Sequence, residues 1–295
     1  MEFTAFRELG PWAQAVIAAF VLLLCTLIFV ILAFAISIPV FGLENIQNIN
    51  ALKLMQIFQS AGMFLVPPFI IGWLFTGNTF QYLSFKQKVI PSCIILTILL
   101  VIVANPVITF VGNINSNMTL PEQFSGIEQW MRQMEDQASE LMTKFIQATT
   151  FGGILLNLVM IVLIPAVGEE LLFRGVIQKI FFRITRNHHL AIWITAILFS
   201  ALHLQFYGFF PRMILGALFG YLLVYSGSIW LPIAGHFINN LVAAFFLYME
   251  KNKGLQVDTI DAQIMQWPIV IISLILTILI IWRIKNQYKN LLDDI

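Results

Sequence analysis

The stretch FIQATTFGGILLNLVMIVLIPAVGEELLFRG, residues 145–175, ends a long apolar run with charged side chains. Up to Gly168 it contains no Asp, Glu, Lys or Arg, and it exceeds the roughly 20 residues that a helix needs to cross a membrane. Glu169, Glu170 and Arg174 then follow. Because ionisable groups are costly inside a membrane, the stretch predicts a membrane-embedded helix that carries a functional site.

The composition of the whole chain is that of an integral membrane protein. Hydrophobic residues make up 59% of the 295 residues and charged residues only 11%, whereas roughly a quarter of the residues are charged in globular proteins. The net charge is +1 and no basic cluster is interleaved with aromatic residues, which excludes nucleic acid as a partner. Cys25 and Cys93 lie in apolar runs, so we expect small hydrophobic side chains and no disulfide.

Uncharged stretches of sufficient length mark the predicted spans. The run from Leu9 to Leu43 is longer than the apolar part of a signal peptide and lacks a clear cleavage site, which predicts a retained helix. The uncharged stretch between Arg212 and Glu250 is too long for one span and divides at the turn sequence SGS, residues 226–228. The sequence thus predicts an all-α polytopic bundle of about eight transmembrane helices. These are Trp12–Val40, Met55–Phe75, Val89–Val111, Thr149–Val167, Leu190–Leu204, Phe210–Tyr225, Trp230–Tyr248 and Ile264–Trp282.

We treat residues 1–295 as one integral membrane domain with a single sizeable extramembrane segment, residues 112–148. TLPE at 119–122 has capping-box spacing and predicts a helix that begins at Thr119, with Glu122 reaching back. We expect an amphipathic helix that lies on the membrane or caps the bundle; an ordinary helix packed on a neighbouring loop fits the pattern equally well. The apolar residues at helical spacing are Ile127, Trp130, Met131, Met134, Leu141, Met142 and Phe145.

The distribution of Lys and Arg indicates an orientation. With eight spans both termini lie on one side, and that side collects nine basic residues against six on the other. This excess favours cytoplasmic termini, and we expect a bacterial cytoplasmic membrane. The nine are Arg7, Lys86, Lys88, Lys179, Arg183, Arg186, Arg283, Lys285 and Lys289. The six are Lys53, Arg132, Lys144, Arg212, Lys251 and Lys253.

Within the predicted spans, functional residues occur in pairs one helical turn apart. Glu170 and Arg174 are in the favourable order for an ion pair on one helical face, and we expect a mainly structural role for this pair. Glu169 points about 100° away from Glu170 and is left for other work. The other two pairs are Phe199 with His203 and His236 with Asn240.

A turn at RNHH, residues 186–189, predicts which residues meet. It makes an antiparallel hairpin in which residues equally far from the turn lie at the same height, and this places Glu169 and Glu170 level with His203. His236 is harder to place, because the turn at 226–228 puts it nearer the opposite side.

For His236 to join the site, WLPIAG at 230–235 should be extended or re-entrant, which Pro232 and Gly235 allow.

Carboxylates, imidazoles and an amide in one place permit amide hydrolysis. A carboxylate with imidazoles can bind a divalent metal and lower the pKa of a bound water to about 7, or the carboxylate can act directly as general base. An Asn amide or a second imidazole can donate to an oxyanion. No serine or cysteine pairs with a histidine, so covalent catalysis is not supported.

The three motifs, EELLFRG at 169–175, FxxxH at 199–203 and HxxxN at 236–240, resemble in this order the CPBP intramembrane protease family. That family groups the CAAX prenyl endopeptidases with bacteriocin-processing and self-immunity proteins, also called Abi proteins. The resemblance implies a helical bundle of about eight spans whose site lies below the membrane surface, with a catalytic core here at residues 149–248.

The resemblance also implies a role for each site residue. Metal-dependent and metal-free glutamate-protease mechanisms both fit, and in the first case Glu169, His203 and His236 would be the ligands of a divalent metal, with zinc expected. The second and third motifs are close together and no prenyl-binding feature is visible, so CAAX specificity is not carried over. Glu169 and His203 would activate the attacking water, His236 and Asn240 would bind metal or stabilise the oxyanion, and Glu170 and Arg174 would brace the site.

We therefore interpret the chain as a membrane endopeptidase that cleaves a peptide or membrane-associated protein by attack of water. One alternative is a transporter that uses the carboxylates as a proton relay; inverted repeats should accompany it, and the sequence shows none. The other is a non-catalytic binding protein, such as an immunity protein.

Overall fold

The computed structural model describes residues 6–148 and 150–293, and all regular structure in these ranges is helical, which confirms the all-α prediction. Thr149, where the fourth predicted span begins, lies outside the described residues. The α-helices are α1 Pro11–Phe41, α2 Ile49–Ser60, α3 Val66–Thr76, α4 Thr79–Tyr82, α5 Pro91–Ser116, α6 Ser125–Ile146, α7 Phe151–Asn157, α8 Ile164–Leu172, α9 Gln178–Thr185, α10 His188–Ala201, α11 Phe209–Ser226, α12 Trp230–Lys253, α13 Val257–Ile264 and α14 Trp267–Asp293. The 3-10 or π-helical segments are η1 Leu43–Asn45, η2 Ala61–Leu65, η3 Glu122–Phe124, η4 Leu158–Leu163, η5 Phe173–Ile177 and η6 Phe206–Gly208.

The number of full spans differs from the predicted eight. In the described ranges seven helices are long and apolar enough to cross a membrane, and α10 replaces the remaining predicted span with only 14 residues. At 1.5 Å per residue α10 measures about 21 Å, short of the roughly 30 Å hydrocarbon core. The polytopic bundle is confirmed, but α10 alone is too short to cross the hydrocarbon core. The seven are Pro11–Phe41, Ile49–Thr76, Pro91–Ser116, Phe151–Thr185, Phe206–Ser226, Trp230–Lys253 and Trp267–Lys289.

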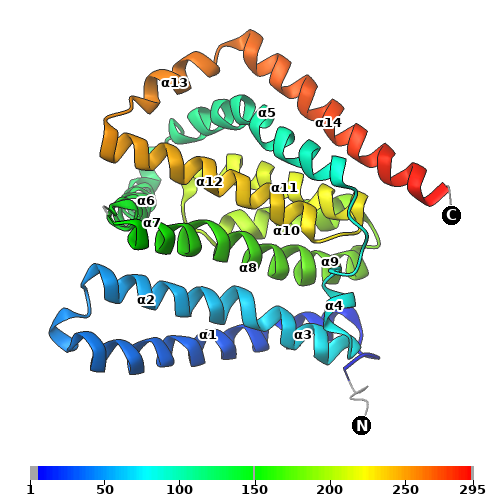
Figure 1. Ribbon diagram of the computed structural model, residues 1–295, viewed down its shortest axis with the longest axis horizontal. Helices are drawn as coiled ribbons and strands as arrows, with labels where there is room; N and C mark the ends of the chain where they lie inside the picture. Colours follow the sequence, from blue (N-terminus) through cyan, green and yellow to red (C-terminus); the bar gives the residue numbers. More distant parts are fainter. Residues whose placement is uncertain (1–5, 149, 294–295) are drawn as a thin grey trace.

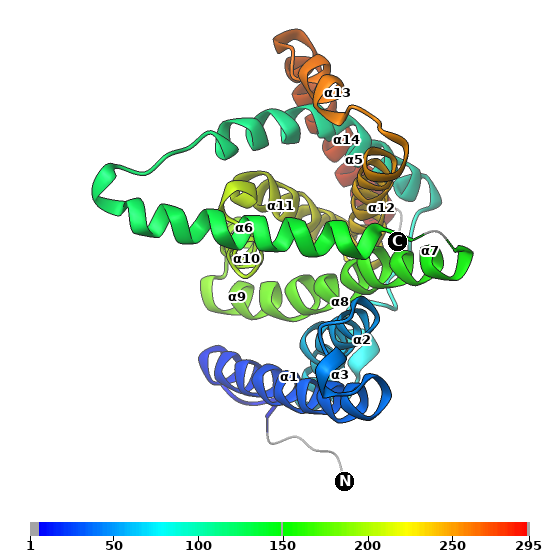
Figure 2. The ribbon, with the colours of Figure 1, turned by 90° about the vertical axis from the view of Figure 1, so that its left-hand side faces the viewer.

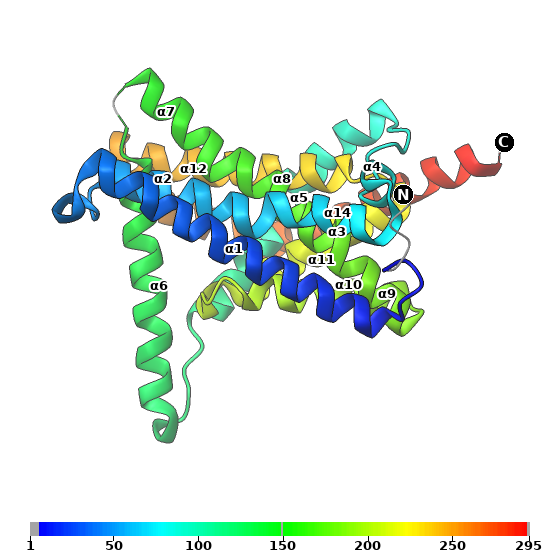
Figure 3. The same ribbon diagram turned by 90° about the horizontal axis from the view of Figure 1, so that it is seen from below.

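The long helices lie side by side, and both ends of the described chain lie on one side of the bundle (Figure 1). α1, α2 and α3 form a layer that packs on α8 and α9, while α12, α11, α5 and α14 lie beyond these helices (Figure 2). α6 runs across the bundle on the side away from the chain ends (Figure 3). The amphipathic helix therefore lies where the long helices end.

The site-bearing helix, Phe151–Thr185, is one 35-residue helix with a π-helical segment on each side of α8. Such π turns occur frequently at functional sites. Glu169 and Glu170 lie in α8, whereas Arg174 lies in η5. The charged motif therefore falls at the most irregular part of an otherwise continuous helix.

The turn predicted at 186–189 is confirmed. α9 ends where Arg186 adopts a left-handed conformation, with φ of 56°. The side chain of Asn187 then caps α10 by accepting a hydrogen bond from Leu190 N–H at 3.2 Å. α9 and α10 thus form the expected hairpin.

The start of α6 contradicts the capping-box prediction. Thr119 caps no helix, because Pro121 disfavours helical backbone at the residue before it. Glu128, inside α6, accepts the Leu120 N–H at 2.9 Å. This hydrogen bond holds the pKa of Glu128 below its ordinary value. Glu128 therefore takes the backbone-binding role that the sequence predicts for Glu122.

Gly168→Ala should destabilise the protein, because α8 approaches η2 closely at this position. A Cβ at Gly168 would lie 2.8 Å from Cβ of Phe64, and overpacking of this kind costs about 1–3 kcal/mol. We expect a lower Tm in thermal unfolding of the detergent-purified protein. Gly152→Ala, on the same long helix, is the matched control because no described residue has an atom within 4 Å of a Cβ there. Equal Tm values for the two variants would contradict the close approach.

Candidate active site

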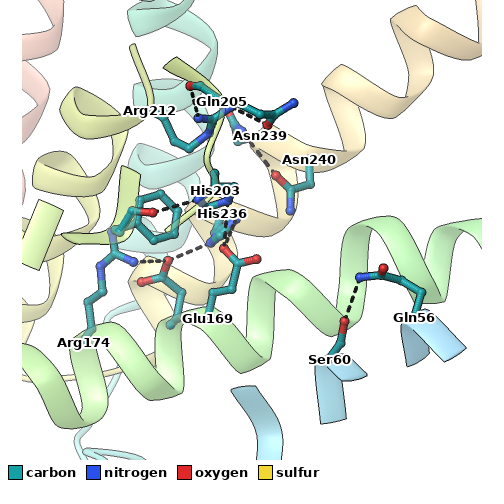
Figure 4. A network of polar contacts seen from close by, with 12 residues as sticks. Gln56, Ser60, Glu169, Arg174, His203, Gln205, Arg212, His236, Asn239 and Asn240 are labelled. Carbon is teal, nitrogen blue, oxygen red and sulfur yellow. Dashed lines mark hydrogen bonds and ion pairs between the residues drawn. The ribbon is translucent and has the colours of Figure 1, made fainter. Parts of the chain in front are cut away.

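The structure brings the three sequence motifs together at one place (Figure 4). Their residues come from four segments: Glu169 and Glu170 from α8, Arg174 from η5, His203 from the connection after α10, and His236 and Asn240 from α12. All six predicted site residues thus lie in one region, although they span much of the second half of the chain.

Glu169 faces two imidazoles across a short gap. Its Oε2 lies 3.9 Å from Nε2 of His203 and 3.8 Å from Nε2 of His236. The same oxygen is buried and has no hydrogen-bond partner among the residues that the structure describes. Both distances exceed those of a direct hydrogen bond and suit a small bridging group such as water. The prediction that Glu169 lies level with His203 is confirmed.

The two imidazoles are oriented through their other nitrogen atoms. Nδ1 of His203 lies 2.7 Å from the carbonyl oxygen of Phe199, and Nδ1 of His236 lies 2.7 Å from Oε1 of Glu170. Carbonyl and carboxylate oxygens accept, so Nδ1–H is the donor in both rings. In the neutral rings the Nε2 lone pairs are therefore the ones turned toward Glu169.

The predicted Glu170–Arg174 ion pair forms and is fully buried. Nη1 of Arg174 donates to Oε1 of Glu170 at 2.8 Å, and both side chains are 0% exposed. Nη2 donates to the carbonyl oxygen of Gly216 on α11, also at 2.8 Å. The guanidinium carbon lies 4.8 Å and 5.7 Å from the ring centroids of Phe199 and Phe219. The pair therefore ties the motif-bearing helix to α10 and α11. Glu170 was predicted to lie level with His203, but its carboxylate instead contacts Arg174 and His236.

His236 reaches the site from a regular helix, so the expected extended or re-entrant segment before it is wrong. α12 begins at Trp230 and contains Pro232 in its first turn, where a proline is tolerated. The preceding turn is covered by the connection between α4 and α5, because Ile229 N–H donates to the carbonyl oxygen of Ser84 at 3.2 Å. α12 therefore begins beside this connection, and a helical path brings His236 to the carboxylates.

A cavity of about 250 Å³ lies beside the histidines. Its polar wall comprises His203, Arg212, His236, Asn239 and Asn240. Asn239 donates to Oδ1 of Asn240 at 3.3 Å, so the amide N–H groups of Asn240 are its remaining donors at the cavity. A substrate amide placed here would meet hydrogen-bond donors as well as imidazoles.

Sequence reasoning missed Arg212 and Asn239 as part of this wall. Arg212 was counted among the basic residues outside the spans, but it is the single charged residue between Arg186 and Glu250, and that isolation was the available signal. Asn239 adjoins a motif residue and has no comparable signal. Gln205, also missed, holds the guanidinium of Arg212 through its backbone oxygen at 3.2 Å and its Oε1 at 2.8 Å.

The atoms turned toward the gap fit a divalent metal in type and direction. Two imidazole nitrogens and a carboxylate oxygen form a common catalytic zinc set. The spacing is more open, because Oε2 of Glu169 lies 3.8 Å and 3.9 Å from the two nitrogens. In the described part of the chain no group of three or more His, Cys, Asp or Glu side chains lies close enough together to hold a metal ion as the side chains stand.

Comparison with known proteins confirms the family resemblance over the region of the motifs. Residues 150–242 match the family described as type II CAAX prenyl endopeptidase Rce1-like, which is of the CPBP type. The uncharacterized protein YpbD of Bacillus subtilis (strain 168) is 28% identical over 92 residues, which are 30% of this chain and 44% of that protein. The matched region thus spans less than half of that relative's length. No solved structure matches the chain.

Arg174→Ala should destabilise the protein by about 3–5 kcal/mol, because it leaves the buried carboxylate of Glu170 without its cation. The measurement is thermal unfolding of the detergent-purified protein. Lys144→Ala is the matched control: it removes the cation of an exposed pair with Glu140 at 2.7 Å, and such pairs contribute about 0–1 kcal/mol. Similar losses of Tm in the two variants would show that the buried pair has no special structural role.

Proposed function

We propose that this protein is an intramembrane endopeptidase that hydrolyses a peptide bond with a water activated by Glu169. The observation that carries the proposal is the buried, unpartnered Oε2 of Glu169, which faces two imidazole Nε2 atoms beside a cavity. An ionisable group in this position is costly in a membrane protein and therefore points to chemistry. The family match over residues 150–242 supports an endopeptidase of the CAAX type.

In the proposed reaction the water lies between Glu169 and the imidazoles. As its oxygen attacks the carbonyl carbon of the substrate, one proton moves to Oε2 of Glu169 and the carbonyl oxygen becomes an oxyanion. When the C–N bond breaks, the same proton passes to the departing nitrogen, which leaves as an amine, while the acyl group keeps the oxygen of the water. The two O–H groups of the water donate to Oε2 of Glu169 and to Nε2 of one of the two imidazoles, which orients the water for attack.

Asn240 is the residue that we assign to the oxyanion. Asn239 holds its carbonyl end, and Asn240 lines the cavity with its amide N–H groups as the available donors. A donor placed in advance where charge develops is worth about 10²–10³ in kcat. Glu170 and Arg174 act through His236, which they hold in place, and are positioning residues.

As the alternative to this metal-free reaction, we propose that Glu169, His203 and His236 hold a divalent metal through the same atoms, with zinc the best match to one carboxylate and two imidazoles. When bound, zinc would polarise the substrate carbonyl and lower the pKa of a bound water toward about 7. Glu170 would orient His236 as a ligand by accepting its Nδ1–H, as the carboxylate partners of metal-binding histidines usually do.

The chain is an integral membrane protein, and we propose a bacterial cytoplasmic membrane with both termini in the cytoplasm. The excess of basic residues on the side of the termini supports this orientation. The connection that follows α10 lies by α6, because the rings of Trp130 and Phe206 pack 5.4 Å apart, and α6 lies away from the chain ends (Figure 1). In this orientation the connection lies toward the outer side. The proposed substrate is a peptide or membrane-associated protein.

Glu169→Gln should abolish hydrolysis while the fold is retained, because Oε2 has no hydrogen-bond partner to lose. We expect the rate to fall by about 10²–10⁴, the range for a lost general base, in an assay of detergent-purified protein with a pool of fluorescence-quenched decapeptides. Glu140→Gln, which changes an exposed carboxylate on α6, is the control for activity. Hydrolysis that persists in purified Glu169→Gln protein would refute the assigned role.

The metal assignment is tested by the zinc content of the purified protein, measured by elemental mass spectrometry. We expect zinc near one equivalent in the wild type, and its loss in the double variant His203→Ala, His236→Ala. A double variant of His188→Ala and His189→Ala, two histidines at the start of α10, controls for the number of histidines removed. If neither the wild type nor the variants contain metal, Glu169 acts as a base without metal assistance.

A further inference from the structure

Arg212 presents a cation in the wall of the site cavity. Its guanidinium donates from Nη1 to the backbone oxygen of Gln205 at 3.2 Å and from Nη2 to Oε1 of the same residue at 2.8 Å. Among the described residues it forms no ion pair with an Asp or Glu. A guanidinium has five N–H donors, so its remaining donors are available to a partner in the cavity.

The position of the guanidinium is fixed by its contacts with the connection after α10. A Cβ at Gly208 would lie 2.9 Å from Nη2 of Arg212, so the backbone of the connection after α10 packs directly against this group. The same connection carries His203 and Gln205. The cation is therefore fixed relative to the imidazole that faces Glu169, and a ligand bound to one is placed relative to the other.

The carboxylates nearest to Arg212 have other partners. Glu135 on α6 accepts a hydrogen bond from Tyr207 N–H at 3.3 Å, and Glu169 faces the two imidazoles. Arg212 is half-buried in the cavity wall, which also includes the apolar side chains of Pro211 and Leu215, and a partly desolvated cation favours an anionic partner. The wall is therefore complementary to an anionic group that arrives with the substrate.

We propose that Arg212 determines specificity by binding a carboxylate of the substrate peptide, close to the bond that is cleaved. This assignment rests on the proposed endopeptidase function. Arginine binds carboxylates through paired, oriented hydrogen bonds, which fix position as well as charge. The cavity, at about 250 Å³, is smaller than the roughly 300–1,000 Å³ of ordinary ligand pockets. Only a short stretch of peptide fits, and its carboxylate belongs to the C-terminus or to an acidic side chain near the cleaved bond.

The test measures binding of fluorescein-labelled hexapeptide pools to the detergent-purified Glu169→Gln protein, so that it depends on no cleavage. One pool has a free C-terminus and no Asp or Glu, the second is its C-terminal amide, and the third is the amide with one Asp near its end. We expect the free acid or the Asp pool to bind about tenfold or more tightly than the plain amide. Whichever of the two binds tightly identifies the source of the carboxylate.

Two further substitutions in the same background assign the preference to Arg212. Arg212→Gln should bring the ratio of affinities to about one. Gln205→Glu should do the same with Arg212 present, because the new carboxylate in place of Oε1 would pair with the guanidinium and leave it unavailable to the peptide. This second variant keeps the test valid if Arg212→Gln misfolds. Arg132→Gln, which removes an exposed cation of α6, is the control and should keep the ratio.

Equal binding of all three pools, or a preference that survives both Arg212→Gln and Gln205→Glu, would overturn the assignment. The endopeptidase function is judged separately, by cleavage of the same pools by the protein with Glu169 intact. A binding preference without cleavage would support Arg212 as the carboxylate site and reject the proposed function. Cleavage without a binding preference would support the endopeptidase function and reject Arg212 as the carboxylate site.

Discussion

The buried pair of Glu170 and Arg174 is the contact on which the site depends. Two charges with 0% exposure are tolerated in an apolar bundle when they pair with each other and form further hydrogen bonds, and this pair does so although Oε2 of Glu170 and Nε of Arg174 have no hydrogen-bond partner among the described residues. Oε1 of Glu170 accepts from Arg174 at 2.8 Å and from His236 at 2.7 Å. The guanidinium also reaches the carbonyl oxygen of Gly216 on α11. One ion pair thus joins α8 and η5 to α11 and α12, and its carboxylate also holds the imidazole of His236.

Adjacent carboxylates acquire opposite environments because a helix turns by about 100° per residue. Glu170 points toward Arg174 and is neutralised by it, whereas Glu169 points to His203 and His236 and pairs with no Lys or Arg among the described residues. The two adjacent carboxylates therefore differ in role: Glu170 stabilises the structure through Arg174, and Glu169 is the carboxylate that can accept a proton.

Features that depend on local spacing could be predicted from the sequence, and features that depend on contacts between distant segments could not. The ion pair follows from i, i+4 spacing, and the meeting of Glu169 with His203 follows from the turn that joins their helices. The height of His236 depends on the contact of its helix start with Ser84, far away in the sequence. Arg212 lies near the end of a predicted span, so its position alone did not distinguish a surface cation from one in a cavity.

The short α10 explains why a polar wall exists inside the bundle. After its 14 residues the chain continues through residues 203–208 without α-helical hydrogen bonds, and such backbone is tolerated in a membrane protein only when it is buried in protein or lines a cavity. Its carbonyl groups need donors: Asn115 donates to Phe206 at 3.0 Å, and Arg212 donates to Gln205 at 3.2 Å. Arg212 uses some of its N–H donors on this connection and presents the others to the cavity. The interruption that opens the site therefore also supplies the cation that a substrate carboxylate would meet.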